Sequence, residues 1–375
     1  QAPAGKDCNK NGIGTPFVKA GEFGLSRPVI REWTTDPKKH AKSTDVLICV
    51  VGATCGKINL GADCAIGRSA AAVRPDAEKL DQFYLHYFLE GKVQEFRDGS
   101  LGAAQTVISK NMLAEMSIPA PPLEEQKRIV AVLDAALEGL TRAKENAEAN
   151  LQNARELFEN YLSAIFDTSE GGQASKLGKG VEILTGFAFK SAEYSENVDD
   201  MAMVRGDNIV QGLFRWKDVK RWPLDKCDEF NKFRLAADDV LLAMDRTWVK
   251  NGIKYAIVRE ADLPLLLVQR VARLRCLTTL SNEYLGYFIG SKQFEKYVLS
   301  IQTGMGVPHI SGQQIKDCPF YLPDMPVQLS TVAELNAIRS KVEVLEADYR
   351  TKLTDIADLR QSLLQKAFAG ELTLG

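Results

Sequence analysis

A repeat with a constant offset of 202 residues constrains this chain more than any other feature of its sequence. The offset holds without a gap from Ser109, which aligns with Ser311, to Phe166, which aligns with Phe368. A unit that occurs twice has to be settled before any other part of the fold, because a missed repeat misassigns the whole architecture. The 375 residues are enough for two or three domains.

Each copy of the repeat contains a long segment with the composition of a helix. No proline interrupts residues 123–166 or 327–368, and the helix-favouring residues Ala, Glu, Leu, Lys, Arg and Gln dominate both segments. Apolar residues recur at alternating steps of four and three, which predicts a heptad seam in each segment. The predicted seam residues are Leu133, Leu137, Leu140, Leu151, Phe158, Leu335, Ile338, Val342, Leu345, Ile356 and Leu363.

Two helices of this kind are expected to pack on each other. Each would be about 65 Å long at 1.5 Å per residue, so neither could bury its apolar stripe inside a small domain. A lone stalk, or a coil that joins two chains, is the commoner arrangement for heptads. Two copies in one chain, each after a globular segment, favour an antiparallel intramolecular coiled coil instead.

The chain is therefore predicted to be an α+β protein with two similar globular domains. The first domain covers residues 1–122 and is followed by a helix at 123–167. The second covers 168–324 and is followed by a helical segment at 325–375. Asp81–Leu89 predicts an amphipathic helix, and short apolar runs bounded by turn residues predict strands. The predicted strands of the first domain are Thr15–Lys19, Val46–Val51 and Ala70–Val73.

The second domain repeats the plan of the first with looser spacing. The matching stretches are Phe17–Lys19 with Met203–Arg205, Thr44–Ile48 with Asp238–Leu242, and Tyr84–Phe88 with Tyr284–Phe288. The loops between them differ, and loops carry recognition whereas scaffolds carry packing. Two similar domain scaffolds with different loops predict two binding units of different specificity. Leu177–Gly186 has no counterpart in the first domain and the chain starts with Gln1, so we expect that domain to be clipped or rearranged at its start.

Composition narrows the classes of function. The longest apolar run, Val46–Ala53, is far shorter than the ~20 residues that span a bilayer, and no signal-peptide pattern opens the chain, so a cytoplasmic protein is predicted. Seven cysteines without a C-x-x-C spacing indicate reduced thiols. Three histidines without zinc-ligand spacing argue against a structural metal. A net charge of −2, with the acid concentrated on the helices, predicts only weak non-specific binding to DNA.

One candidate DNA contact lies in the loop after the Asp-Val-Leu strand of the first domain. Gly52–Lys57 resembles a phosphate-binding loop, but it is one residue short and has Ile58 in place of Ser or Thr, so a nucleotide site is not predicted. Its Thr54 and Lys57 still suit contact with a DNA phosphate or base edge.

The corresponding loop of the second domain, Asp245–Gly252, offers more side chains for recognition. Its candidate contacts to phosphates, base edges or stacked bases are Arg246, Trp248, Lys250 and Asn251. An ordinary exposed hairpin is an equally good interpretation of this loop.

The segment Phe214–Trp222 interleaves basic and aromatic residues. Its cations are Arg215, Lys217, Lys220 and Arg221. Strand alternation could turn the aromatic rings inward and leave the charges on a solvated face, but four positive charges in nine residues favour an edge that faces DNA. The candidate DNA contacts are completed by Lys19, Lys110 and Arg205.

No catalytic residue and no metal site are predicted. Pro75-Asp76 followed by Glu90-Gly-Lys92 fits a loose pattern of metal-dependent nucleases. Glu90 falls at the end of an apolar helix and the second domain has Gly290-Ser-Lys at this place, so we interpret the match as chance. The sequence contains no Asn-Pro-Pro-Tyr/Phe motif for base methylation and no Walker loop for ATP hydrolysis.

Three stretches carry a resemblance to a known family. Ile118-Pro-Ala-Pro-Pro-Leu-Glu-Glu-Gln-Lys-Arg-Ile129 resembles the junction between recognition domain and conserved helix in specificity subunits of Type I DNA restriction-modification enzymes. Asp238–Arg246 is similar to a strand and loop of that family's recognition domain, and Leu364–Leu372 to its C-terminal ending. The second junction, Leu322–Gln328, departs from the pattern because it lacks the double proline and the acidic residue before Gln.

This resemblance implies a non-catalytic subunit that reads double-stranded DNA. Each of two target-recognition domains would read one half of a bipartite site, and the helices would set the spacing between the halves. Their outer surfaces would bind two methyltransferase subunits, through which restriction subunits join. S-adenosylmethionine, ATP and Mg²⁺ would belong to those partners, with no cofactor in this chain.

Two other functions stay open at this point. One is a coiled-coil interaction or structural protein whose globular units bind protein, and the other is a stand-alone nuclease that rests on the chance pattern alone. The half-site sequences and the spacer are not readable from these loops.

Overall fold

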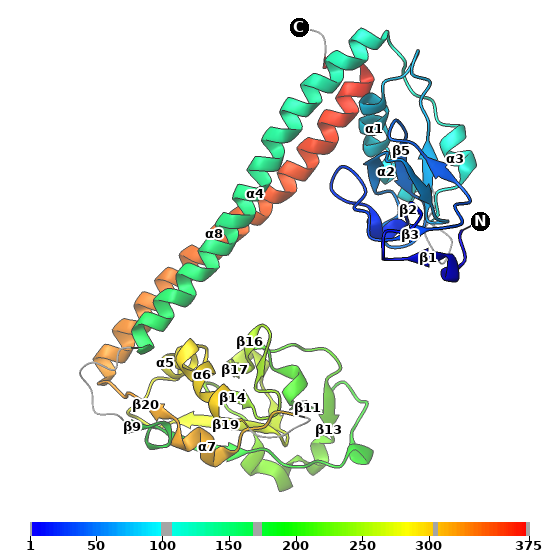
Figure 1. The fold of residues 1–375 in the computed structure, drawn as a ribbon. Coiled ribbons are helices and arrows are strands. Elements are labelled where there is room, and N and C mark those ends of the chain that lie inside the picture. Colours follow the sequence, from blue (N-terminus) through cyan, green and yellow to red (C-terminus); the bar gives the residue numbers. More distant parts are fainter. Residues whose placement is uncertain (1, 99–106, 168–174, 303–306, 373–375) are drawn as a thin grey trace. The chain divides into compact units, whose positions relative to one another are not determined.

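The computed structural model describes residues 2–98, 107–167, 175–302 and 307–372. The predicted second domain starts at residues 168–174 and the predicted C-terminal segment ends at 373–375, and both stretches lie outside the described residues. The chain divides into two compact units. Unit 1 holds residues 1–149 and 349–375, and unit 2 holds residues 150–348, so each unit is one globular domain with one end of each long helix (Figure 1).

The two predicted helices form. Helix α4 spans Leu123–Asp167 and helix α8 spans Met325–Ala369. In unit 1, Leu133 and Leu137 near the start of α4 cluster with Leu364 and Ala367 near the end of α8. In unit 2, Leu162 and Phe166 near the end of α4 cluster with Val332 and Leu335 near the start of α8. Opposite ends meet in both units, which confirms the antiparallel intramolecular pairing.

Burial corrects one part of the predicted seam. Leu133, Leu137, Leu335 and Val342 are buried, and the half-buried members are Leu140, Leu151, Phe158, Ile338, Ile356 and Leu363. Leu345 was wrongly assigned to the seam, because its side chain is 41% exposed. After Val342 the stripe advances by four residues to Glu346, whose carboxylate accepts a hydrogen bond from Arg155 of α4 at 3.3 Å. A polar pair thus replaces an apolar one at this level of the coil.

The globular domain of unit 1 combines two sheets with three short helices. One sheet has the order β1(Cys8–Asn9)-β3(Trp33–Thr34)-β2(Thr15–Val18)-β7(Cys64–Ile66)-β4(His40–Ala41), and the other has the order β6(Ile58–Leu60)-β5(Val46–Cys49)-β8(Ala70–Val73). The helices are α1(Gln82–Gly91), α2(Val93–Asp98) and α3(Lys110–Ala114). The three predicted strands correspond to β2, β5 and β8, and the predicted amphipathic helix is α1, capped by the Asp81 carboxylate.

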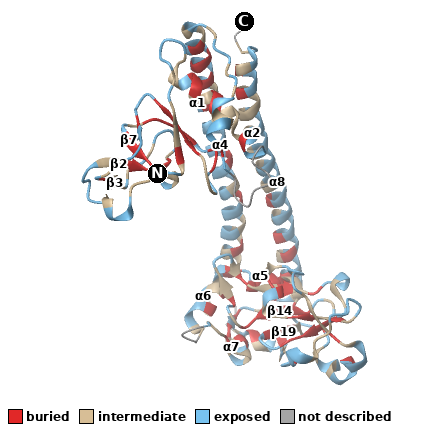
Figure 2. Cartoon of the chain, turned by 90° about the vertical axis from the view of Figure 1, so that its right-hand side faces the viewer, coloured by how far each residue is buried: buried red, intermediate tan, exposed pale blue. Residues whose placement is uncertain are grey.

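The globular domain of unit 2 follows the same plan with additions. Its sheets have the orders β10(Val181–Thr185)-β19(Val271–Cys276)-β14(Val240–Ala243)-β17(Tyr255–Ile257)-β12(Gln211–Gly212) and β13(Lys220–Trp222)-β11(Met201–Val204)-β18(Leu265–Leu267). Two strand pairs, β15(Trp248–Val249)-β16(Gly252–Ile253) and β9(Ser175–Lys176)-β20(Pro319–Phe320), flank them. The helices are α5(Asn282–Ile289), α6(Lys292–Ile301) and α7(Gly312–Asp317). Figure 2 shows the buried positions in red, concentrated in α1, α5 and the central strands.

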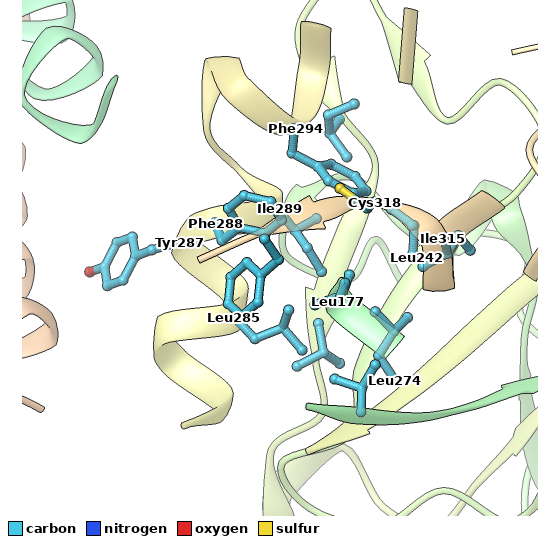
Figure 3. Packing of buried hydrophobic residues seen from close by; sticks show 14 of the residues in the cluster. Leu177, Leu242, Leu274, Leu285, Tyr287, Phe288, Ile289, Phe294, Ile315 and Cys318 are labelled. Atoms are coloured by element: carbon cyan, nitrogen blue, oxygen red, sulfur yellow. The ribbon is translucent and has the colours of Figure 1, made fainter. Parts of the chain in front are cut away.

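The core of unit 2 shows how α5 joins the sheet to the long helices. Figure 3 shows Phe288 and Ile289 of α5 packed with Phe294 of α6 and with Leu242 and Leu274 of the sheet. Tyr287 points away from this cluster, and its hydroxyl lies 2.5 Å from the Asn336 side chain of α8. The helix therefore buries one face in the domain and offers the other to α8.

A buried glutamine fixes the start of each long helix to its domain. The Gln126 amide accepts a hydrogen bond from the Asp81 N–H at 2.8 Å and donates to the carbonyls of Lys79 and Pro121, both at 2.8 Å. Gln328 repeats this arrangement with the Ser281 N–H at 2.8 Å and with the carbonyls of Thr279 and Pro323 at 2.8 and 2.7 Å. Both glutamine side chains are fully buried, so each needs these partners inside the protein.

A phenylalanine from the end of the other long helix completes each junction. In unit 1, Phe368 lies edge-on to Tyr84 and Phe88 of α1, with ring centroids 5.0 and 5.2 Å apart. In unit 2, Phe166 is tilted against Tyr284 and edge-on to Phe288 of α5, at 5.3 and 5.6 Å. Each domain is thus held by the start of one long helix and the end of the other. Within the described residues, we find no helix with the length and apolar character needed to cross a membrane.

Candidate nucleic-acid interface

The candidate recognition loops leave the two sheets beside an ion pair that recurs in both domains, in which the carboxylate is buried and the arginine is half exposed. Asp45, just before β5, accepts two hydrogen bonds from Arg74 at 2.7 and 2.8 Å and one from the Lys42 N–H at 2.8 Å. Asp239, just before β14, accepts two from Arg275 at 2.7 Å. Burial alone would raise the pKa of Asp45, but the hydrogen bonds from Arg74 and Lys42 bring it below its usual value. The strands that lead into the loops are thereby fixed alike.

In unit 1 the loop side chains already have partners inside the domain. The Lys57 ammonium donates to the Phe23 carbonyl at 2.8 Å, and the Thr54 hydroxyl lies 3.2 Å from the Cys49 thiol. A Cβ on Gly56, whose φ is +89°, would come within 2.8 Å of the Val93 side chain, so the loop fits closely against α2. Thr54 and Lys57 are both exposed and accessible to a ligand, and their contact with DNA stays a prediction.

The matching loop of unit 2, Asp245–Gly252, has two parts. One part borders a groove, and the other lies among charged groups. Trp248 is half-buried and packs against the domain core, so part of its ring is engaged in packing rather than free for stacking. With Lys250 and Asn251 it borders a groove of about 630 Å³ that Phe158 of α4 and Glu343 of α8 also line. A related groove of about 760 Å³ in unit 1 includes Thr54 and Lys57. In both units the loop therefore borders the long helices.

Arg246 lies in the other part of this loop, within a cluster of charged groups. Its backbone has a φ of +47°, unusual for an arginine, and its N–H donates to the Pro308 carbonyl at 2.7 Å. The preceding Asp245 carboxylate lies 2.6 Å from His309 Nδ1 and 3.6 Å from Arg270 Nε. These contacts hold the loop in a strained conformation that leaves Arg246 exposed, as occurs often at binding sites.

Lys254 is a half-buried cation beside the other charged groups of this cluster. Burial is the main cause that lowers the pKa of its ammonium; Arg215 and Arg246 add to that shift, and Asp207 and Asp245 oppose it. Cations gathered so closely are stabilised by a polyanion such as the DNA backbone. Sequence reasoning missed Lys254, because a single lysine between Ile253 and Tyr255 gives no signal of the arginines that the fold brings to it.

The segment Phe214–Trp222 was interpreted either as a strand with its aromatic rings turned inward or as a basic edge that faces DNA. The structure agrees with part of each interpretation. Trp222 is buried in the domain, as inward alternation predicts, and Arg221 of the same strand donates to the Asp200 carbonyl at 2.7 Å. Phe214 is likewise half-buried against the core, whereas Trp216, which stacks on it at 4.8 Å, is exposed. The exposed cations beside this pair are Arg215 and Lys217, and Lys220 is half-buried in β13.

Three predicted DNA contacts remain: Lys19 and Arg205, which follow the matching strands β2 and β11, and Lys110. Lys19, after β2, pairs with Glu32, and that hydrogen bond is the main cause that raises the pKa of its ammonium. Arg205, after β11, donates to the Asp218 carbonyl at 3.3 Å and so joins the Phe214–Trp222 segment. Lys110 is exposed at the first position of α3. The structure brings together Arg205, Arg215 and Lys217 in unit 2, whereas Lys19 and Lys110 belong to unit 1.

The residues of the nuclease-like pattern have other roles. Glu90 of α1 accepts hydrogen bonds from Arg360 of α8 at 2.5 and 3.2 Å, which ties the domain to the long helix. Asp76 pairs with Lys79 on the surface. Among the described residues, no group of three or more His, Cys, Asp or Glu side chains is placed to hold a metal ion.

Comparison with known proteins gives one consistent result. Residues 2–151 match the family model described as Type I restriction modification DNA specificity domain. The specificity subunit of Type I restriction enzyme MjaVIII from Methanocaldococcus jannaschii is 25% identical over 89% of this chain and 78% of that protein. The EcoAI specificity subunit from Escherichia coli is 35% identical over 46% of this chain and 29% of that protein.

Solved structures share the fold. A chain from a structure of a type I restriction-modification system matches with a TM-score of 0.79 and 19% identity, over 96% of this chain and 92% of that one. The HsdS subunit of Thermoanaerobacter tengcongensis matches with a TM-score of 0.61 and 19% identity, over 96% and 91%.

Proposed function

This chain belongs to the specificity subunits of Type I restriction-modification enzymes, and we propose that it reads a bipartite DNA target, one half with each globular domain. The observation that carries the proposal is the scaffold that the two globular domains share. The Asp–Arg pairs and the glutamine junctions agree between the domains, whereas the loops that leave this scaffold differ. Two identical supports for two different loops suit a protein that reads two different sequences.

We place the DNA contacts of the second half-site on the charged cluster of unit 2. Arg246 and Arg215 suit the acceptor edge of a guanine or a phosphate, and Lys254 suits a phosphate. The net charge of −2 supplies little long-range attraction for DNA, so partner subunits are expected to contribute part of the grip. The runner-up function, a coiled-coil interaction protein, leaves this cluster without a role.

The proposed partners are two methyltransferase subunits on the outer surfaces of α4 and α8, with restriction subunits joined through them. The chain itself is proposed to be non-catalytic and to act in the cytoplasm. S-adenosylmethionine, ATP and Mg²⁺ would then bind to the partners.

A DNA pull-down with and without the methyltransferase subunits tests this function. We expect retention of specific duplex DNA by the assembled complex, and neither methylation nor ATP hydrolysis by the purified chain alone. Equal and sequence-independent retention in both samples, or turnover by the chain free of partners, would contradict the proposal.

We further propose that the long helices act as a ruler between the half-sites. Four residues inserted after Ala147 add about 6 Å of helix, at 1.5 Å per residue, and rotate the rest of the helix by about 40° past a full turn. That length is nearly two base pairs at ~3.4 Å each. The methylated site should therefore gain a longer spacer while both half-sites stay the same.

A seven-residue insertion is the control for this experiment, because it preserves the heptad phase. It separates a change of length from a broken seam. Folded, active insertion variants that still methylate the original spacing would show that the helices are packing elements and not a ruler.

A further inference from the structure

An exposed tryptophan, Trp216, lies on a rigid turn of unit 2 beside Phe214, which is half-buried against the domain core. The turn Leu213–Asp218, here named the Trp216 tip, leads from β12 toward β13. Leu213 is 63% exposed and Trp216 is 43% exposed, although both are large and apolar. Trp216 stacks on Phe214 with an angle of 24° between the rings. Exposed apolar side chains grouped in this way mark an interaction site.

A fully buried asparagine holds the tip in place. The Asn208 side-chain amide donates to the carbonyls of Arg215 and Lys217 at 3.4 and 3.3 Å, and the Asn208 backbone carbonyl accepts from the Arg215 N–H at 2.8 Å. The Arg205 side chain donates to the Asp218 carbonyl at 3.3 Å. A preformed turn loses little conformational entropy when it binds, so the aromatic pair is presented ready for a ligand.

The charges around the tip identify the kind of ligand. Residues 213–221 carry four cations and a single anion, Asp218. Arg215 and Lys217 alternate with the two stacked rings and are exposed. Arg215 also belongs to the charged cluster with Arg246 and Lys254. Cations that flank an apolar wedge suit nucleic acid, in which phosphates lie on both sides of stacked bases.

We propose that the Trp216 tip is a wedge that stacks on a base of the second half-site and opens the adjoining base step, while Arg215 and Lys217 contact the flanking phosphates. The proposal rests on the proposed function and adds local deformation of the DNA to it. Recognition at this step would depend on how easily the step unstacks as well as on base edges.

The first domain provides an internal comparison. A turn after β2 carries Leu25, which is fully exposed, and the buried Asn59 of β6 accepts a hydrogen bond from the Gly24 N–H of this turn at 3.0 Å. No aromatic residue accompanies Leu25 on this turn, Gly24–Arg27. Stacking on a base is therefore expected at the second half-site and not at the first.

The test uses the complete complex with its methyltransferase subunits and duplexes that carry its target sequence. 2-Aminopurine replaces single bases of each half-site, except the methylated base. In the unaltered complex, binding should change the fluorescence of 2-aminopurine at one position of the second half-site. Trp216→Ala should abolish that change and weaken binding by roughly 5- to 150-fold, the fold-change that corresponds to loss of one base–aromatic stack.

Three further variants make the result specific. Trp216→Phe should retain the fluorescence change, because the ring is kept. Lys217→Gln should lower the salt dependence of binding by about one phosphate contact. Val198→Ala, at a residue 74% exposed elsewhere in unit 2, should leave affinity and fluorescence unchanged.

Several outcomes would overturn the proposal. Unaltered affinity or unaltered 2-aminopurine signals in Trp216→Ala would show that the ring does not touch DNA. Loss of methyltransferase subunits by this variant in the absence of DNA, measured by size-exclusion chromatography, would assign the tip to a protein partner. A complex with Trp216 intact that shows no sequence preference would refute the proposed function itself, which keeps the two failures distinguishable.

Discussion

The two globular domains agree closely where they join the long helices and differ where the sheets open into loops. Gln126 and Gln328 make the same three hydrogen bonds, and Phe368 and Phe166 pack on the same pair of aromatic residues. A join of this kind tolerates little change, since each buried polar group needs its partner.

The loops, unlike the junctions, differ between the two domains. The Lys57 side chain of Gly52–Lys57 bonds to its own domain, whereas in Asp245–Gly252 the Asp245 carboxylate contacts His309 and Arg246 is exposed. The tip of the first domain carries Leu25 and that of the second carries Trp216. The difference teaches that the residues that anchor each domain are separate from the loops proposed to read DNA, so that one set can vary while the other is kept.

The largest expected effect comes from placing a charge in the helix seam. Leu335→Asp should cost several kcal/mol of unfolding free energy, because Leu335 is fully buried and an unpaired carboxylate there has no partner. Leu345→Asp is the matched control on the same helix and should cost about 0.5 kcal/mol or less, as expected of an exposed site. Thermal or urea denaturation of both variants measures the difference. Equal losses in the two variants would contradict the corrected seam.

A smaller effect is expected at the glutamine junctions. Gln126→Ala and Gln328→Ala should each cost about 1–3 kcal/mol, since each removes a fully buried side chain and leaves one backbone N–H and two carbonyls without their partner. The losses should be similar because the two sets of bonds match. Hydrogen exchange at the Asp81 and Ser281 amides would locate the damage in the expected unit. A large loss of unfolding free energy in one variant and none in the other would contradict the equivalence of the two junctions.

The smallest expected effect concerns the Asp45–Arg74 pair and depends on pH. Because the pKa of Asp45 is lowered in the folded state, the carboxylate stabilises the fold above the unfolded pKa of about 3.9 and loses this effect as pH falls through the folded pKa. Asp45→Asn should therefore cost about 1–2 kcal/mol at pH 7, a charge-assisted hydrogen-bond loss. The gap to the parent protein should close as the pH falls below about 4. A pH-independent gap would assign the loss to packing instead of charge.

The sequence predicted the parts of the fold that depend on periodicity. Leu133 and Leu335 are buried as the heptad pattern predicts, and α4 and α8 pair within the chain. The error at Leu345 arose because this residue follows Val342 at a heptad step of three, while the helix turns Glu346 toward Arg155. Periodicity cannot identify a polar seam position whose partner lies 191 residues away.

The candidate site was less predictable, for a physical reason. Its residue types were visible in Arg215, Trp216 and Arg246, but their grouping depends on contacts between distant segments. Lys254 and His309 entered the cluster only through the fold. Trp248 looked like a free aromatic residue in the loop, yet the core covers part of its ring.

If two similar domains with different loops read two different sequences, the methylation pattern of DNA should show this most directly, in cells that express this chain with its methyltransferase subunits. Sequencing of methylated positions should reveal one asymmetric bipartite sequence with a spacer of fixed length. Exchange of the loop Asp245–Gly252 or of the Trp216 tip should then alter one half of that sequence and leave the other half and the spacer unchanged. A single uninterrupted motif, or a loop exchange that alters both halves together, would contradict the account.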